Sequence, residues 1–315
     1  MTRHEVDAAV VGGGPAGLAA AAWLARYRRS VVVLDSEDYR AGAVDRSHGY
    51  LGRDPQVPRE LSADGRAEVC AYPTAELRPG VRVEHVARRD DGMLEVGADL
   101  LCHRLVLACG VTDTFPDVEG FAEHYGASVF HCPACDGYEA RDRDVVALGW
   151  DARLVGFAAT LLTWARSVTV VTNGQRFEGD DACRATMVSD GTQLVEQTAV
   201  RLVGGRSSLQ GLELDSGRVL PATLVFFSVA HSPNAQLART LGCRLDDEGF
   251  VAVDDEGQTS VPGVYAAGDL TPGLQLVQVA AASGTVAGVA AAQSLFGRDG
   301  AAGSPDAGPD PSPPA

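Results

Sequence analysis

The most telling stretch for the architecture is Val6-Asp7-Ala8-Ala9-Val10-Val11-Gly12-Gly13-Gly14-Pro15-Ala16-Gly17. Its first half is an apolar run typical of a buried β-strand, and its second half contains the pattern Gly-x-Gly-x-x-Gly. Glycines at these positions allow a tight turn and a close approach of a pyrophosphate, and the start of the next helix offers free N–H groups. The stretch therefore predicts a dinucleotide-binding loop, which comprises Gly12, Gly14, Pro15, Ala16 and Gly17.

The residues after the loop complete a β-α-β unit. Leu18 to Tyr27 is Ala-rich, as expected of a helix, and Ser30 to Leu34 is a second β-branched run. Asp35 ends that run, where a carboxylate can bind ribose hydroxyls. A tight glycine turn before a core helix is the structural alternative, and the loop alone does not distinguish FAD from NAD.

A second β-α-β pattern lies in the middle of the chain. Strands are predicted at Val145 to Leu148 and Val168 to Val171, with a helix at Arg153 to Ala165 between them. The first pattern then returns near Val264. We therefore expect an α/β fold with two Rossmann-like dinucleotide-binding domains (three-layer ββα), the second inserted into the first.

The domain boundaries follow from this order. The first domain would be discontinuous and comprise residues 1–115 and 246–298, and the inserted domain would comprise residues 116–245. Residues 299–315 consist of Gly, Ala, Ser, Asp and Pro, so we expect a disordered tail there.

The segment Cys132-Pro133-Ala134-Cys135-Asp136 places two thiols beside an acid. Thiols at this spacing can close a disulfide and open it again, and the acid can supply or take the proton that this exchange needs. One alternative is a zinc site, which needs two further ligands where only His131 is near. The other is a pair of inert buried cysteines. A redox pair and a dinucleotide loop in one chain imply electron flow between a cofactor and a dithiol.

A late segment, Thr259 to Asp269, has a turn, a buried strand and an acid beside a glycine. It resembles the second flavin signature of flavoproteins with two dinucleotide domains. In such proteins the acid, here Asp269 after Gly268, approaches the ribityl chain of FAD, and Gln278 would begin the helix that points at the flavin ring. A strand-end aspartate that caps a helix is the structural alternative.

With two flavin signatures and an internal Cys-x-x-Cys-Asp-Gly, the chain resembles the low-molecular-weight thioredoxin reductase family of FAD-dependent pyridine nucleotide-disulfide oxidoreductases. The resemblance covers residues 5 to about 296. It implies bound FAD and a homodimer. It also implies that Cys135 faces the flavin, that Cys132 exchanges with the substrate, and that Asp136 moves the proton.

The second nucleotide loop departs from the family pattern. Where the family has Gly-x-Gly-x-x-Ala, this chain has Trp150 and Asp151 after a single glycine. An acid at this position repels a pyrophosphate. The family's His-Arg-Arg cluster for the 2′-phosphate is also missing, with only Arg176 in the matching stretch. NADPH binding is therefore doubtful, unless Arg153 and Arg176 compensate.

The segment Ser47 to Asp54, together with Cys132-Pro133, resembles a branch of the family. That branch contains flavin-dependent dithiol oxidases of gliotoxin and holomycin type, which close disulfides in small molecules and pass electrons from FAD to oxygen. The resemblance places His48 near the flavin, with a surface-loop histidine as the alternative. One feature disagrees, because the branch commonly has His after the second cysteine, where this chain has Asp136.

Bulk properties narrow the partners and the compartment. The chain has 315 residues and a formal net charge of −16, which argues against a nucleic-acid partner because phosphate binding needs clustered Lys and Arg. The start lacks the apolar core of a signal peptide, and Leu276 to Ala292 is too short and weakly apolar for a membrane span. We therefore expect a cytoplasmic protein with no membrane partner.

Three functions remain open. The first, which we favour, is a dithiol oxidase that closes a disulfide in a small-molecule dithiol, with electrons passing through Cys132, Cys135 and FAD to oxygen. The second is an NADPH-dependent disulfide reductase with a thioredoxin-like protein as partner. The third is a flavin-bound redox sensor whose cysteines oxidise without repeated turnover.

Overall fold

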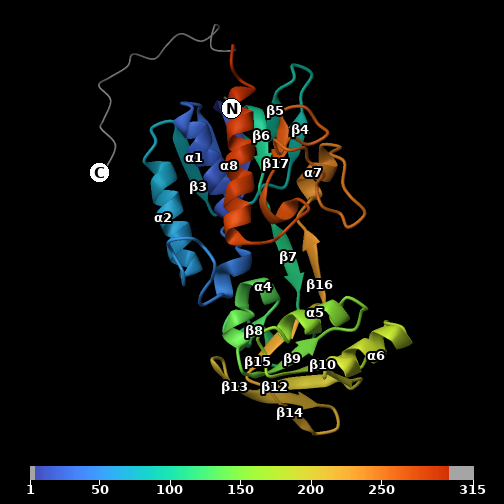
Figure 1. Cartoon of the computed structure of the whole chain (residues 1–315). Coiled ribbons are helices and arrows are strands. Elements are labelled where there is room, and N and C mark those ends of the chain that lie inside the picture. Colours follow the sequence, from blue (N-terminus) through green and yellow to red (C-terminus); the bar gives the residue numbers. More distant parts are fainter. Residues whose placement is uncertain (1–3, 298–315) are drawn as a thin grey trace.

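The computed structural model describes residues 4–297, so the expected tail at 299–315 lies outside the described residues. Figure 1 shows two bodies, one above the other, connected by a pair of strands. We call the upper body, built on a seven-stranded sheet, the first unit, and the lower body, built on five-stranded and three-stranded sheets, the inserted unit. The expected α/β fold with two Rossmann-like units, the second inserted into the first, is confirmed.

The sheet of the first unit begins with the strand that leads into the glycine loop. Its strands lie in the order β3 (Ala75–Pro79), β2 (Val31–Asp35), β1 (His4–Val11), β6 (Leu100–Leu107), β5 (Leu94–Val96) and β4 (Val86–Arg88), with β17 (Val264–Ala266) also paired to β6. The strand β1 runs parallel to β2 and β6, whereas β4 and β5 form an antiparallel hairpin.

Three helices lie on one side of this sheet in Figure 1: α1 (Pro15–Arg26), α2 (Pro58–Cys70) and α8 (Val277–Gln293). The small residues of α1 and α8 let these two helices approach closely. A Cβ atom at Gly284 would lie 2.0 Å from the carbonyl oxygen of Ala16, and one at Gly288 would lie 2.5 Å from that of Ala20. The start of α8 is thereby held against the glycine loop.

The inserted unit has three layers. Its parallel sheet has the order β11 (Gln193–Val195), β10 (Ser167–Val171), β9 (Asp144–Leu148), β15 (Leu224–Phe227) and β8 (Val129–Phe130). Side chains of α5 (Leu154–Leu161) and α6 (Asp181–Ser189) fill the core on one face. The other face packs against α3 (Phe121–His124) and the antiparallel strands β12 (Ala199–Gly205), β13 (Ser208–Leu214) and β14 (Val219–Pro221).

The helix α5 is shorter than the sequence suggests. It begins at Leu154 and ends at Leu161, where the expected helix continues to Ala165. After Leu161 the chain tightens, because Thr163 N–H donates to Thr160 and Trp164 N–H donates to Leu161. Such three-residue bonds are common at helix ends, where the last carbonyl groups lack helical partners.

The two units are connected by the antiparallel strands β7 (Val111–Thr114) and β16 (Ala230–Pro233), which cross the gap side by side in Figure 1. After β16 the chain rejoins the first unit, since Leu237 of α7 (Gln236–Thr240) and Cys243 lie in its hydrophobic core. The second crossing therefore lies at β16, earlier than the boundary at residues 245–246 that we expected. The apolar side chains of residues 235–243 fill the first core and cause this shift.

The described helices can be checked for a segment that could span a membrane. Within residues 4–297, no helix is long and apolar enough to cross a bilayer.

Candidate active site

The glycine loop between β1 and α1 has the shape of a phosphate cradle. Gly12 has a φ of 109°, and a Cβ atom there would lie 2.3 Å from the carbonyl oxygen of Ala108. A Cβ atom at Gly17 would lie 1.8 Å from the carbonyl oxygen of Gly12. At Gly14, by contrast, no described atom beyond its two neighbours in the chain lies within 4 Å of the position that a Cβ atom would take. The loop is therefore tightly closed on the protein side and open beside Gly14, as a bound pyrophosphate requires.

The start of α1 faces the same open space. Pro15 is the first helical residue, Ala16 is buried behind it, and Gly14 precedes the helix without a capping side chain. The free N–H groups and the positive end of the helix dipole are thus available to an anion. The predicted loop residues Gly12, Gly14, Pro15, Ala16 and Gly17 are brought together here.

Asp35 lies at the end of β2, next to the loop. Its side chain is buried and accepts hydrogen bonds from the Glu37 backbone N–H, at 3.0 Å, and from the Tyr39 hydroxyl. A Cβ atom at Gly13 would clash with the Asp35 carboxylate, so only glycine allows the loop to pass this acid. The position suits ribose recognition, and Tyr39 is a neighbour that the sequence pattern did not indicate.

The late flavin-type segment meets the same loop. Gly268 and Asp269 form the short helix η3 (Gly268–Leu270), and a Cβ atom at Gly268 would lie 2.8 Å from the Ala16 Cβ. Burial raises the pKa of the Asp269 carboxyl group, and the nearby charge of Arg40 opposes this rise. Gln278, in the first turn of α8, has a buried Oε1 atom with no hydrogen-bond partner among residues 4–297. An acceptor of this kind fits a ligand that brings its own N–H or O–H donor.

The redox pair follows directly after β8. Cys132 caps the short helix α4 (Pro133–Asp136) and forms a disulfide with Cys135. The backbone N–H of Cys135 donates a hydrogen bond to the Cys132 Sγ atom at 3.1 Å. Within the described residues, no group of three or more His, Cys, Asp and Glu side chains is arranged to hold a metal ion. The Cys132–Cys135 disulfide is the kind of bond that thiol–disulfide exchange opens and closes.

Asp136 is the buried acid of this site. Burial raises the pKa of its carboxyl group to about 7, while the nearby charge of His48 lowers it and that of Glu139 raises it further. An aspartate that titrates near neutral pH can both take and give a proton under physiological conditions. The sequence indicated the residue, but the burial that sets its pKa is visible only in the fold.

His48 lies against the segment that carries the redox pair. Its Nε2 atom is 3.5 Å from Oε1 of Glu139, in the helix η2 (Tyr138–Ala140), and its Nδ1–H donates to Oδ1 of Asp54 at 2.9 Å. The neighbouring Gly49 comes close to Gln278, because a Cβ atom there would lie 3.5 Å from the Gln278 amide nitrogen. The loop of His48 thus contacts both the predicted flavin helix and the redox segment.

A polar network that the sequence did not reveal connects Asp269 to the redox segment. Arg40, which begins the short helix η1 (Arg40–Ala43), donates to Asp269 at 3.0 Å and makes two hydrogen bonds of 2.7 and 2.8 Å to Asp113 of β7. The Tyr125 hydroxyl donates to Asp113 at 3.3 Å and shares a hydrogen bond of 3.0 Å with His131 Nδ1. Burial lowers the pKa of His131 to about 4, so this ring is neutral at physiological pH.

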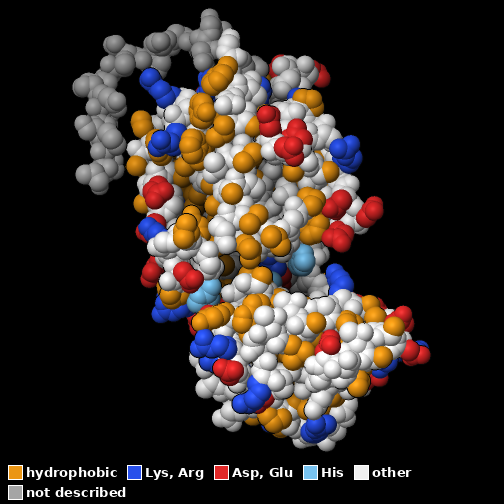
Figure 2. Space-filling model, in the orientation of Figure 1, with side chains coloured by type: hydrophobic (Ala, Val, Ile, Leu, Met, Phe, Trp, Pro, Cys, Tyr) orange, Lys and Arg blue, Asp and Glu red, His pale blue; other side chains and the backbone are white. Residues whose placement is uncertain are grey.

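The network therefore ends one residue before Cys132. Its members come from four separate stretches of the chain and belong to no recognisable motif. A lone arginine in the loop after a nucleotide-binding strand is the only sequence signal for it, and such a signal is weak. Figure 2 shows histidine side chains at the junction of the two units.

The second nucleotide loop, between β9 and α5, contains its own anion. Asp151 accepts a hydrogen bond from the Arg153 backbone N–H at 2.8 Å, and its other oxygen pairs with the Arg153 guanidinium at 2.6 Å. The carboxylate therefore occupies the start of α5, where a pyrophosphate would bind in a nucleotide domain. Arg153, which we considered as a compensating residue, is already paired with this acid.

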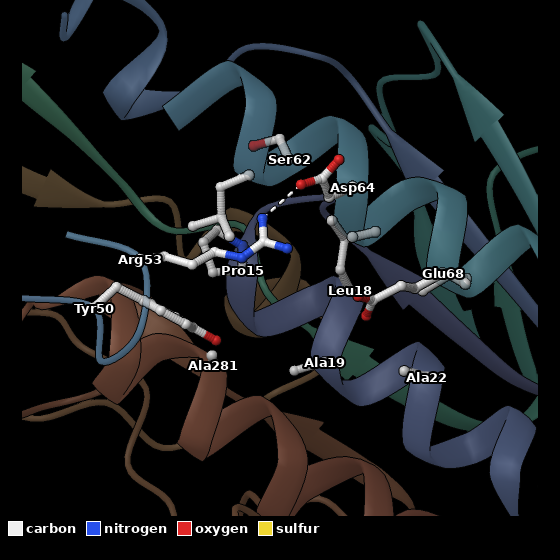
Figure 3. A pocket seen from close by; sticks show the side chains of 13 residues that line it. Pro15, Leu18, Ala19, Ala22, Tyr50, Arg53, Ser62, Asp64, Glu68 and Ala281 are labelled. Atoms are coloured by element: carbon white, nitrogen blue, oxygen red, sulfur yellow. Dashed lines mark hydrogen bonds and ion pairs between the residues drawn. The ribbon is translucent and has the colours of Figure 1, made fainter. Parts of the chain in front are cut away.

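A small cavity of about 180 Å³ lies in the first unit, between α1, α2 and the loop after His48. Figure 3 shows Arg53 pointing across it to Asp64, with an ion pair of 2.5 Å, and Tyr50 beside Ala281. None of the residues that line it belongs to the inserted unit. The cavity is smaller than the usual pockets for cofactors and drug-sized ligands, which measure about 300–1,000 Å³. It does not take part in the redox site.

Comparisons with known proteins agree with this arrangement. Residues 6–284 match the family model described as pyridine nucleotide-disulphide oxidoreductase. The chain is 31% identical over 311 residues to the protein named thioredoxin reductase tcpT of Claviceps purpurea, an alignment that covers 94% of this chain and 96% of that protein.

Solved structures give the same picture. The structure of HlmI superposes with a TM-score of 0.87 at 33% identity and covers 95% of each chain. A putative thioredoxin reductase TrxB from Bacillus anthracis superposes with a TM-score of 0.86 at 27% identity, covering 93% of this chain and 99% of that one. The chain therefore belongs to the pyridine nucleotide-disulphide oxidoreductase family of enzymes, and within that family it is thioredoxin reductase-like.

Proposed function

We propose that the protein is an FAD-dependent dithiol oxidase that closes a disulfide in a small-molecule dithiol in the cytoplasm. The observation that carries this proposal is the start of α5, where the Asp151 carboxylate lies at the expected NADPH pyrophosphate position and Arg153 is paired with it. A nucleotide would have to displace an acid that is held by two kinds of hydrogen bond and would meet its negative charge. Electrons then enter from a thiol substrate more readily than from NADPH.

The residues of the first unit fit FAD. The open space beside Gly14 and the free start of α1 suit its pyrophosphate, Asp35 suits a ribose, and the unpartnered Gln278 Oε1 suits a donor on the ring or its side chain. When bound, FAD supplies a two-electron acceptor that can pass the electrons to oxygen.

The residues of the inserted unit perform the thiol chemistry. In this proposal Cys132 exchanges with the substrate, Cys135 lies on the flavin side, and Asp136 accepts protons from the substrate thiols. The N–H of Cys135 points at the Cys132 Sγ atom, which stabilises a thiolate there once the disulfide opens. Because the pKa of Asp136 is raised to about 7, its ionised, proton-accepting form predominates above that pH.

The second candidate is an NADPH-dependent reductase of a thioredoxin-like protein. Two observations favour it: Asp136 stands where the oxidase branch commonly has His, and curated relatives such as tcpT of Claviceps purpurea are named thioredoxin reductases. The likeness to HlmI, at 33% identity, supports the place beside the holomycin-type branch that we expected.

An anaerobic titration distinguishes the two candidates. The oxidised, flavin-loaded protein is mixed with NADPH, with NADH or with dithiothreitol, and the flavin absorbance near 450 nm is followed before and after air is admitted. We expect bleaching by dithiothreitol, and recovery with hydrogen peroxide in air, but no bleaching by either nucleotide. Fast bleaching by NADPH would select the reductase. Replacement of Cys135 by Ser should abolish the response to dithiothreitol while leaving FAD bound.

The protein is also proposed to form a homodimer through the outer side of α8. Val279 and Val286 are exposed there, with side chains at helical spacing on one face. Leu274, just before the helix, is 71% exposed. Figure 2 shows hydrophobic side chains along this part of the first unit.

A further inference from the structure

The buried position of Asp136 poses a problem for repeated proton transfer. In the proposed exchange, the first substrate thiol gives its proton to the Asp136 carboxylate and its sulfur bonds to Cys132 Sγ. The Cys132–Cys135 bond breaks, and its electron pair stays on the Cys135 sulfur. The second substrate sulfur then attacks the first, which closes the substrate disulfide and leaves Cys132 as a thiolate.

Two substrate thiols thus lose two protons and two electrons, and the two cysteines gain the electrons. Asp136 can hold only one proton, so it must release the first before it accepts the second. The residue is only 8% exposed, which leaves little direct contact with water. A neighbouring group has to conduct the proton outward.

His48 is placed to do this. Asp136 and Glu139 are three residues apart on consecutive helical turns, so their side chains share a face. The His48 ring lies over that face, with Nε2 at 3.5 Å from Glu139 Oε1. The other Glu139 oxygen, Oε2, is buried and has no partner in the part of the chain that the structure describes. A carboxylate left half-satisfied beside an imidazole is suited to accept a transient proton.

The outer side of the ring is fixed by an exposed acid. Nδ1–H donates to Asp54 Oδ1 at 2.9 Å, and the Asp54 side chain is 50% exposed. This bond selects the tautomer whose free, basic atom is Nε2, the atom that faces the interior. The loop is closed by paired backbone hydrogen bonds between Ser47 and Gln56. The Arg53–Asp64 ion pair further ties the loop to α2.

We propose that His48, oriented by Asp54, conducts protons between Asp136 and bulk water during thiol–disulfide exchange. It is a positioning residue that acts through Asp136. The charged and titratable groups around this path are Glu139 and Asp136 of the inserted unit, Asp54 of the same loop, and Tyr125, whose pKa the charge of Asp136 helps to raise. The inference rests on the proposed thiol exchange, but it holds for either direction of electron flow.

The test is a stopped-flow measurement of anaerobic flavin reduction by dithiothreitol, with wild type, His48→Gln, His48→Ala and Asp54→Asn. We expect reduction to slow about tenfold in both His48 variants and less in Asp54→Asn, with the loss growing at low buffer concentration. Added imidazole should restore part of the rate in His48→Ala. The control is His85→Gln, at an exposed position outside the site, which should match wild type with and without imidazole.

Two results would overturn the relay: rates and pH profiles of the His48 variants that equal those of wild type, or slow variants that imidazole and buffer leave unchanged. If His48→Gln loses its flavin, the rate of flavin reduction in Asp54→Asn, and its dependence on buffer concentration, test the relay instead. Reduction by NADPH would overturn the oxidase proposal but not the relay. A wild-type flavin that dithiothreitol does not reduce would overturn both.

Discussion

At the scale of single residues, the buried carboxyl group of Asp136 makes the stability of the fold depend on pH. Below about pH 4, Asp136 is neutral in both the folded and the unfolded chain. Between about pH 4 and 7 the unfolded chain ionises while the folded chain keeps its proton, since the folded pKa is about 7. The free energy of unfolding therefore falls as the pH rises through this window, by up to about 4 kcal/mol.

Asp136→Asn removes this dependence, because asparagine does not titrate. We expect the variant to unfold at a higher temperature than wild type at pH 8, with a difference that grows between pH 5 and 7 and then stays constant. Thermal unfolding followed by circular dichroism measures this. The same variant should exchange thiols about a hundredfold more slowly. Equal melting curves of the variant and wild type at every pH would show that burial of the Asp136 carboxylate does not destabilise the fold.

The residues of this site also show which of its properties a sequence can predict. Cys132, Cys135 and Asp136 were indicated by their spacing alone, and the structure places all three in one turn after β8. The burial of Asp136 and its approach to His48 could not be predicted, because these contacts connect residues about ninety positions apart. Arg40 was missed for the same reason, since its partner Asp113 lies on a distant strand.

At the scale of elements, the glycine loop was predicted correctly from its spacing. The strand, turn and helix are all where the pattern of Gly12 to Gly17 requires them. The loop before α5 was judged eroded from its sequence, and in the structure Asp151 accepts a hydrogen bond from the Arg153 N–H at the start of that helix. Weak NADPH binding there stays a prediction. The sequence left Arg153 open as a compensating residue, because a pairing two positions away cannot be inferred without the turn geometry.

The glycine loop offers a test that separates folding from cofactor binding. Gly14 has a φ of −76°, which any residue can adopt, and its missing Cβ points into open space. We expect Gly14→Ala to fold as stably as wild type without flavin, and to bind FAD at least tenfold more weakly, because the methyl group meets the pyrophosphate.

The matched comparison is Gly17→Ala, whose methyl group would lie 1.8 Å from the Gly12 carbonyl oxygen. That variant should lose stability even without flavin. Flavin fluorescence titration measures affinity, and urea unfolding of the flavin-free proteins measures stability. Undiminished FAD affinity in Gly14→Ala would mean that the pyrophosphate does not lie at this loop.

At the scale of the whole molecule, the insertion of one unit into the other was predicted, but its second boundary was placed too late. In the sequence, residues 235–243 look like any segment between two strands. Only the packing of Leu237 and Cys243 assigns them to the hydrophobic core of the first unit. The orientation of the units depends on features that no local pattern reports. One of them is the ion pair between Arg40 of the first unit and Asp113 on the connecting strand β7.

The proposed homodimer also belongs to the scale of the whole molecule. The outer side of α8 exposes Val279 and Val286 in the first unit, and a second copy of the chain would remove such side chains from water. We expect Val286→Glu to shift the protein from dimer to monomer, with dimer affinity at least tenfold weaker, because a charge would be buried at the contact. Sedimentation velocity over a range of protein concentrations measures this.

The matched control is Val219→Glu on β14, because Val219 and Val286 have the same exposed fraction, 43%. That variant should sediment as wild type does. A wild-type protein that is monomeric at all concentrations, or a dimer that tolerates Val286→Glu, would place the contact elsewhere or remove it.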